Sequence, residues 1–245
     1  MHRVDKMSLT DGKIYESQEL PTIIFGPNKP LSYVLNPKAA CTLCLHFVFF
    51  ANHNYRYFDI ARIHSSPTAL FRIRGSELDP QVLNTYYRLS PESFTFVRDP
   101  LRRFVSFFFE KIFLGGDPDF LPIRDTLTSV HGIDLSPEAN LAQSCLNFAK
   151  LVAPTVDQKS TDPHLRPQYI NLAVGGRFTV DTLLRLEDHG SLLAFFSKWI
   201  GAEKAKWFLS LQFNVQKYAS DELITDELKD LVRSIYAQDY KLFYE

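Results

Sequence analysis

Apolar and polar positions along the chain form two kinds of segment. Short apolar runs of strand length lie at 31–35 (LSYVL) and 93–97 (SFTFV), and segments with helical spacing follow them at 41–52 and 101–113. Strand-like runs that alternate with helix-like segments are typical of α/β domains with a largely parallel sheet. The pattern therefore predicts an α/β fold in which a central, mainly parallel sheet is flanked by helices.

The rest of the chain continues this pattern with longer connections. The expected elements are a helix at 138–152, a strand at 178–186, a helix at 191–199 and a C-terminal helix at 226–243. The stretch at 115–137 contains GGDPD and is expected to be a loop. The polar, proline-punctuated segment APTVDQKSTDPHLRPQ (153–168) is expected to be an exposed functional loop.

Composition indicates an ordinary globular protein of one domain. Hydrophobic residues make up 45% and charged residues 22%, and no Pro-, Gly- or Ser-rich linker marks a boundary. We expect an N-terminal extension at 1–30 and a single domain at 31–245. With 27 basic and 28 acidic side chains the net charge is -1, which argues against a nucleic-acid partner bound by charge.

Membrane and redox signals are weak. The polar N-terminus lacks the apolar core of a secretory signal, and the most apolar stretch, 43–51, is too short to span a bilayer. Three cysteines are too few and odd in number for a disulfide framework. We therefore expect a cytoplasmic protein without a transmembrane segment. A luminal domain of a membrane-anchored enzyme is the alternative, and peripheral membrane association stays open.

The first candidate site is the turn in VLNPKAACT (34–42), between a predicted strand and a predicted helix. A helix N-terminus presents unpaired backbone N–H groups and a positive dipole end, so it favours an anion. Lys38 adds a charge and Thr42 a hydroxyl. The segment is not a Walker A loop, because the required glycines are absent. Taken alone, a solvated turn lysine is the simpler interpretation.

The second candidate turn lies in FVRDPLRRFVS (96–106). Arg98 ends a predicted strand and Ser106 lies about two helical turns further on, so a guanidinium and a hydroxyl can converge on one phosphate. Asp99 and Arg103 are four residues apart, a spacing that allows an ion pair. Two turns, each with a cation and a hydroxyl, indicate a ligand with an anion at both ends.

Together the two motifs resemble the nucleotide-binding pair of the carbohydrate sulfotransferases, which include the chondroitin, dermatan and heparan-sulfate O-sulfotransferases. The resemblance implies a sulfotransferase fold of the P-loop-NTPase-like kind, with 3′-phosphoadenosine 5′-phosphosulfate (PAPS) as donor and 3′-phosphoadenosine 5′-phosphate (PAP) as product. It further implies that Arg98 and Ser106 bind the 3′-phosphate. The residues that it implies for the 5′-phosphosulfate are Pro37, Lys38, Ala39, Ala40, Cys41 and Thr42.

The resemblance runs from about residue 31 to the C-terminus. DPHLRPQ looks like the family's H-W-x-P-Q segment, with Leu165 in place of the usual Trp. Ala40 stands where many relatives have Gly. The acceptor that the resemblance implies is a hydroxyl of a carbohydrate or glycoconjugate.

Sulfuryl transfer resembles phosphoryl transfer, so the enzyme contributes mainly positioning and electrostatics. We expect Lys38 to stabilise charge on the leaving oxygen. A base near neutral pH is naturally a histidine, and the two candidates are His64 and His164. Arg166 is a candidate ligand for an anionic acceptor, with a solvated loop arginine as the alternative. No cluster with metal-ligand spacing is present in the sequence, so no metal is expected.

Three other interpretations compete with this one. Cys41 and Cys44 form a C-x-x-C motif near a helix start, as in thioredoxin-like oxidoreductases. A nucleotide kinase is disfavoured by the missing glycines of the phosphate loop. A non-catalytic module of the same fold that binds a nucleotide or glycan is the third alternative.

Overall fold

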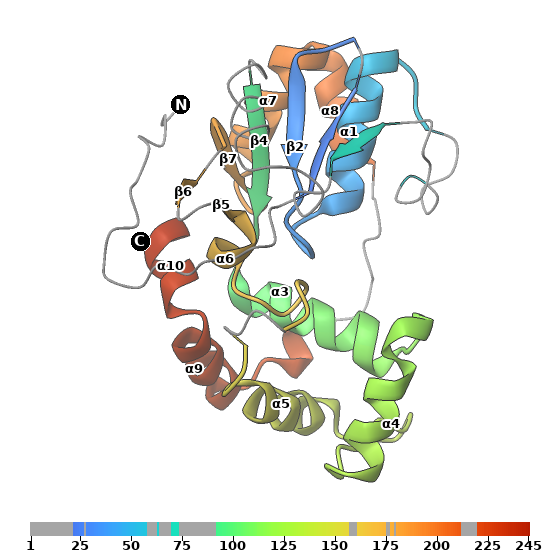
Figure 1. The fold of residues 1–245 in the computed structure, drawn as a ribbon, viewed down its shortest axis with the longest axis vertical. Helices are drawn as coiled ribbons and strands as arrows, with labels where there is room; N and C mark the ends of the chain where they lie inside the picture. Colours follow the sequence, from blue (N-terminus) through green and yellow to red (C-terminus); the bar gives the residue numbers. More distant parts are fainter. Residues whose placement is uncertain are drawn as a thin grey trace. The chain divides into compact units, whose positions relative to one another are not determined.

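The computed structural model describes residues 22–26, 28–57, 63, 70–73, 92–156, 161–174, 177–178, 180–211 and 220–245. The chain divides into two compact units (Figure 1). Unit 1 comprises Met1–Arg98 and Gln168–Gln216, and unit 2 comprises Asp99–Pro167 and Lys217–Glu245.

Unit 1 is built on a five-stranded sheet with the order β3-β1-β2-β4-β7. Its strands are β1 (Ile23–Phe25), β2 (Leu31–Val34), β3 (Phe71–Ile73), β4 (Glu92–Val97) and β7 (Thr182–Arg185). β2, β4 and β7 are parallel, whereas β1 pairs antiparallel with both β2 and β3. A separate antiparallel pair joins β5 (Ala173–Val174) and β6 (Arg177–Phe178). The predicted α/β class is confirmed. The sheet begins at β1, before residue 31, and the domain limits at 1–30 and 31–245 stay a prediction.

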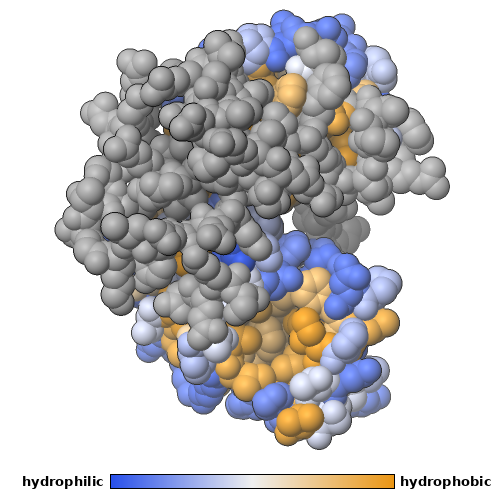
Figure 2. Space-filling view, viewed as in Figure 1, coloured by the Kyte–Doolittle hydropathy of each residue, from blue (hydrophilic) through white to orange (hydrophobic). Residues whose placement is uncertain are grey.

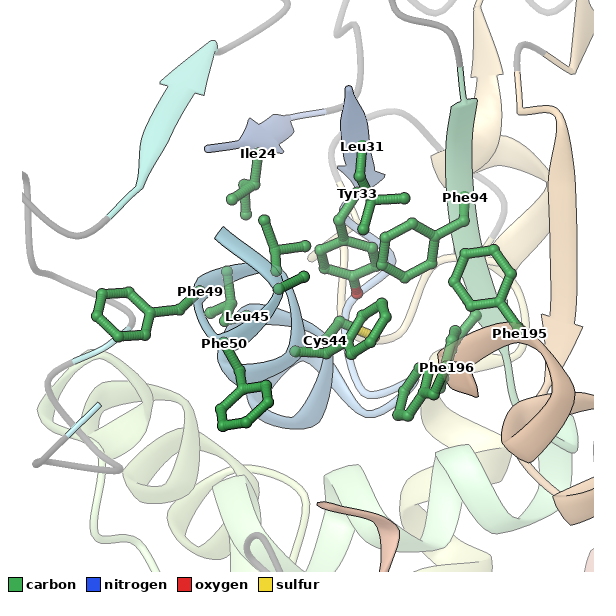
Figure 3. Close-up of a cluster of buried hydrophobic side chains, with 14 of the residues drawn as sticks. Ile24, Leu31, Tyr33, Cys44, Leu45, Phe49, Phe50, Phe94, Phe195 and Phe196 are labelled. Atoms are coloured by element: carbon green, nitrogen blue, oxygen red, sulfur yellow. The ribbon is translucent and has the colours of Figure 1, made fainter. Parts of the chain in front are cut away.

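In its described residues, unit 1 contains the helices α1 (Cys41–His53), α6 (Gln168–Leu172), α7 (His189–Ile200) and α8 (Ala202–Ser210). Aromatic side chains join α1 and α7 to the sheet. Phe47 of α1 stacks on Phe196 of α7 with ring centroids 3.8 Å apart, and its edge meets Phe94 of β4. Figure 3 shows Tyr33 and Phe94 extending from the sheet toward α1, with Phe195 and Phe196 beside them. Each buried phenylalanine stabilises the fold by about 1.5–3 kcal/mol, which makes this cluster the core of the unit.

The parallel pairing of β2 and β4 decides where the candidate turns lie. The register places Leu31 opposite Glu92 and Tyr33 opposite Phe94. All residues of both strands are buried, as expected for central parallel strands covered on both faces. Because parallel neighbours end at the same edge of a sheet, the segment after β2 and Arg98 after β4 leave the sheet at one edge.

All regular elements in the described residues of unit 2 are helices. Its elements are α3 (Pro100–Phe107), the π-helix η3 (Phe108–Phe113), η4 (Pro118–Phe120), α4 (Leu121–Ser129), α5 (Leu141–Val152), η5 (Ser220–Leu223), α9 (Asp226–Ile235) and α10 (Ala237–Phe243). Phe104 of α3 packs against Phe148 of α5 and Tyr236, so the sequence-distant helices share one core. The predicted helix at 101–113 is present, but its second half is a π-helix.

α4 corrects the prediction of a loop at 115–137. Asp117 caps the preceding turn by accepting a hydrogen bond from the backbone N–H of Asp119 at 3.1 Å. Pro118 and Pro122 fall in the first turns of η4 and α4, where a missing N–H costs nothing. The prolines and glycines that indicated a loop therefore mark helix starts. The single strand expected at 178–186 is likewise two short strands, β6 and β7.

Apolar side chains also reach the surface of unit 2. Figure 2 shows them gathered on the face that carries α4 and α5. Large hydrophobic side chains exposed in this unit are Leu114, Leu121, Ile123, Val130 and Leu151. Within the described ranges, no helix has both the length and the apolar character to cross a bilayer.

Candidate functional site

The loop after β2 has an unusual backbone. Lys38 and Ala40 both lie in the left-handed region, with φ of 64° and 61°. A non-glycine residue in this region costs about 1–2 kcal/mol, and such strain clusters at functional sites. The loop therefore holds Lys38 in a conformation that the flanking structure must impose.

This loop leads directly into the N-terminus of α1. Ala40 is the N-cap, and no side chain caps the helix there. A left-handed residue followed by a helical one, here Cys41, turns successive backbone N–H groups to one side and forms an anion-binding concavity. The positive end of the helix dipole adds to this, so the start of α1 is suited to a phosphate or sulfate group.

The Cys41 thiol closes the same loop. It donates a hydrogen bond to the Asn36 carbonyl oxygen at 3.0 Å, and the Tyr33 hydroxyl lies 3.6 Å from its sulfur. Burial raises the pKa of the Cys41 thiol although Lys38 is close, and burial also raises the pKa of Cys44. A thioredoxin-like site needs a thiolate with a lowered pKa, so the C-x-x-C motif here has the opposite character.

A buried amide network joins this loop to the Arg98 turn. The Asn36 side-chain Nδ2 donates to the Phe96 carbonyl at 2.9 Å and to Gln168 Oε1 at 3.0 Å. Gln168 Oε1 also accepts from the Arg98 backbone N–H at 3.0 Å, and its Nε2 donates to the Arg98 carbonyl at 2.7 Å. Neither Asn36 nor Gln168 is exposed to solvent. One glutamine amide thus fixes both backbone groups of Arg98 and, through Asn36, the start of the Lys38 loop.

Asn36 and Gln168 were not among the predicted site residues. Asn36 directly precedes the Pro-Lys pair, and Gln168 ends the DPHLRPQ segment. The one indication in the sequence that these two residues belong to the site is that each lies in or beside a recognised motif. The structure gives both a role in joining three chain segments that are distant in sequence.

In unit 2, the Asp99 carboxylate caps α3 by accepting from the Arg102 backbone N–H at 2.8 Å. Ser106, predicted as a phosphate ligand, is half-buried on this helix. Arg103 is almost fully buried, at 2% exposure, and its guanidinium donates to the carbonyls of Pro163 and Arg166, both at 2.9 Å. The second arginine of the motif therefore holds the DPHLRPQ segment onto α3.

Further hydrogen bonds fix this segment. The Tyr236 hydroxyl donates to the Leu165 carbonyl at 2.7 Å, and Leu165, in place of the family's tryptophan, lies in the core of unit 2. Arg166, predicted as an acceptor ligand, is 5% exposed and donates from Nη2 to the Thr161 carbonyl at 2.9 Å. Its contact with an acceptor stays a prediction, because this conformation uses the guanidinium inside the loop.

His164 lies at the tip of the segment and has a carboxylate partner. Asp162 Oδ1 accepts from the His164 backbone N–H at 2.7 Å and lies 2.7 Å from the ring nitrogen Nδ1. The imidazole packs against Phe107 of α3 and the edge of Phe120, each with ring centroids 6.2 Å away. Its side chain is 35% exposed and is therefore partly accessible to solvent. Burial acts to raise the pKa of Asp162, but the hydrogen bonds from His164 and the nearby Arg103 charge outweigh it and hold that pKa below its ordinary value.

The predicted residues divide between the units. In unit 1 lie the 37–42 loop and Arg98, joined through the amide network, and in unit 2 lie Ser106, His164 and Arg166. His64, the other predicted base, is outside the described residues. Among the residues that the structure covers, no three His, Cys, Asp or Glu side chains gather so that they could hold a metal ion.

A family model described as "Sulfotransferase family" matches residues 21–245 of the chain. Searches of curated proteins and of solved structures gave no significant match.

Proposed function

Because the chain belongs to the sulfotransferase family and therefore transfers sulfuryl groups, we propose that its donor is PAPS and its acceptor a carbohydrate or glycoconjugate hydroxyl. This proposal for the donor and the acceptor rests on the two sequence motifs and on the geometry of the loops that carry them.

The observation that carries the proposal is the Asn36–Gln168–Arg98 network. It fixes the Lys38 loop and the Arg98 turn at one edge of the sheet within a single unit. A donor with anionic groups at both ends needs two cation-bearing turns held at a constant separation. Buried amides joined by hydrogen bonds provide such rigidity, because breaking any of these bonds leaves a buried polar group unpaired.

In this proposal the Lys38 loop binds the 5′-phosphosulfate. The backbone N–H groups of the loop and the dipole of α1 favour the phosphate, and the role of Lys38 is to stabilise the charge that builds on the leaving oxygen. Arg98 binds the 3′-phosphate, and Ser106 supplies a hydroxyl to the same group, as the R-D-P-x-x-R-x-x-S motif implies.

The transfer step is an in-line displacement at sulfur. The acceptor oxygen forms a new S–O bond while the bridging S–O bond of the donor breaks, and PAP leaves with that electron pair. The acceptor proton passes to a base, and Lys38 stabilises the negative charge on the leaving phosphate. No oxidation or reduction takes place, and the step as written requires no metal ion.

We propose His164 as the base. The pairing of its Nδ1 with Asp162 leaves Nε2 as the nitrogen that can accept a proton, on a side chain that is partly exposed. His64 remains the alternative base.

Separate assays of PAP binding and of sulfuryl transfer distinguish the proposed roles of Lys38 and Arg98. PAP at 100 times its dissociation constant should stabilise the protein by about 2.7 kcal/mol in a thermal-shift titration. Radiolabelled PAPS offered with a panel of carbohydrate acceptors, without added metal, should give labelled product. Lys38→Ala should abolish transfer, Arg98→Ala should mainly weaken PAP binding, and Lys29→Ala, in the exposed bend before β2, should change neither.

The other outcomes would identify the competing functions. Tight PAP binding with no transfer to any acceptor would indicate a non-catalytic module. Magnesium-dependent turnover of ATP without PAP binding would indicate a nucleotide kinase and would refute the proposal.

A further inference from the structure

Asp162 makes two hydrogen bonds through one oxygen atom. Oδ1 accepts the backbone N–H of His164 at 2.7 Å and faces the imidazole Nδ1 at 2.7 Å. An ionised carboxylate accepts hydrogen bonds and donates none. The ring nitrogen facing it therefore carries the proton, which leaves Nε2 as the lone-pair nitrogen of the neutral ring.

The surroundings hold this pair in place. The rings of Phe107 and Phe120 lie near the imidazole, each with its centroid 6.2 Å away, and Arg103 fixes the Pro163 carbonyl between the two residues of the pair. Among the described residues, the imidazole interacts with the charges of Asp162 and Asp117, and Arg103 interacts with the charge of Asp162. Asp117 is itself bound to Lys111 at 2.7 Å. Asp162 makes the direct hydrogen bond to the ring and Asp117 acts through its charge, so Asp162 is the residue that selects the tautomer.

We propose that Asp162 is the positioning residue for the base. It holds His164 as the Nδ1–H tautomer, which leaves Nε2 as the nitrogen that accepts the proton, and stabilises the imidazolium that forms on transfer. This inference rests on the proposed function. In the step, the acceptor O–H proton moves to Nε2, the acceptor oxygen bonds to sulfur, PAP departs, and Asp162 stays ionised throughout. The arrangement follows the general logic of a base oriented by a third group.

The tautomer can be measured without any turnover. Nitrogen-15 NMR of His164 at about pH 8.5, roughly two units above the ordinary histidine pKa, should show predominantly the Nδ1–H form. Asp162→Ala should shift the population toward Nε2–H, the form that the ring prefers in water. A native ring that is mainly Nε2–H, or a tautomer ratio that is unchanged in Asp162→Ala, would overturn the proposal.

Kinetics test the consequence for transfer. Asp162→Asn should lower kcat about tenfold or more, with KM for PAPS changed by no more than about twofold, because donor binding does not use this residue. The matched control is Asp134→Asn, because Asp134 accepts the Ser136 backbone N–H in the same i+2 arrangement but has no histidine partner. It should leave kcat and the KM for PAPS unchanged.

A double-mutant comparison separates positioning from general stability. In a His164→Ala background, Asp162→Asn should cause no further loss of kcat, because the base that it orients is gone. An additional tenfold loss there would show that Asp162 acts independently of His164 and would overturn the proposal. If the native protein transfers no sulfuryl group, the proposed function fails, whereas the NMR result still decides whether Asp162 fixes the histidine.

Discussion

Replacement of Gln168 by methionine tests whether the amide network holds the two anion-binding turns. Methionine has a similar length and no hydrogen-bonding amide, so the substitution removes polar contacts with little change in volume. Three hydrogen bonds are lost: one from Asn36 Nδ2, one from the Arg98 N–H and one to the Arg98 carbonyl.

The expected loss of stability follows from these bonds. Each contributes about 0.5–1.5 kcal/mol net, and a buried polar group deprived of its partner costs about 1–3 kcal/mol. We expect Gln168→Met to lower the free energy of unfolding by about 3–4 kcal/mol. With an m-value of about 3 kcal/mol per molar urea, the urea midpoint should fall by about 1 M.

Tryptophan fluorescence is the appropriate probe, because both tryptophans, Trp199 and Trp207, belong to unit 1. The control is Gln143→Met on the exposed face of α5, where the amide contacts only an exposed asparagine. Its effect should stay within about 0.5 kcal/mol. A loss below about 1 kcal/mol in Gln168→Met would refute the structural role given to the network.

Three further predictions follow from local geometry. Ala40→Gly should raise the free energy of unfolding by about 0.5–1 kcal/mol, because relief of left-handed strain exceeds the entropic cost of glycine; a destabilised variant in urea would contradict this. Because the pKa of Asp162 is lowered in the folded state, its ionised form stabilises the protein above the ordinary aspartate pKa of about 3.9, and this stabilisation is lost as pH falls through the lower folded value. Thermal melts should therefore lose more stability between about pH 4 and pH 2 in the native protein than in Asp162→Asn; parallel losses would contradict this. Burial raises the pKa of Cys145 to about 12, so mass spectrometry should find this thiol unalkylated by iodoacetamide until the protein is unfolded; rapid labelling of the folded protein would show that the thiol is accessible.

Individual strands and helices were predictable where the spacing of apolar residues in the sequence matches the repeat of one type of secondary structure. The apolar runs ending at Val34 and Val97, each followed by a turn and a helix, correspond to β2, β4 and their following helices. α4 was missed because the Gly and Pro residues before it are typical both of loops and of helix starts.

In the candidate site, the residues within short sequence motifs were predictable, but the contacts between residues distant in sequence were not. Nothing in the sequence shows that Gln168 meets Asn36, because 132 residues separate them and only the folded sheet brings them together. The left-handed backbone at Lys38 was likewise hidden, since no glycine marks it. The Asp162 partner of His164 was within reach, because the two lie only two residues apart.

Isothermal titration calorimetry with PAP and with adenosine 5′-monophosphate tests the central claim most directly, because the two nucleotides differ only in the 3′-phosphate. The account predicts that the native protein binds PAP about 10–100 times more tightly, as expected when charged hydrogen bonds to one phosphate are added. Arg98→Ala should remove this preference, whereas Lys38→Ala should weaken both nucleotides. No heat with PAP, or equal affinity of the native protein for the two nucleotides, would contradict the claim that these turns bind the two ends of one donor.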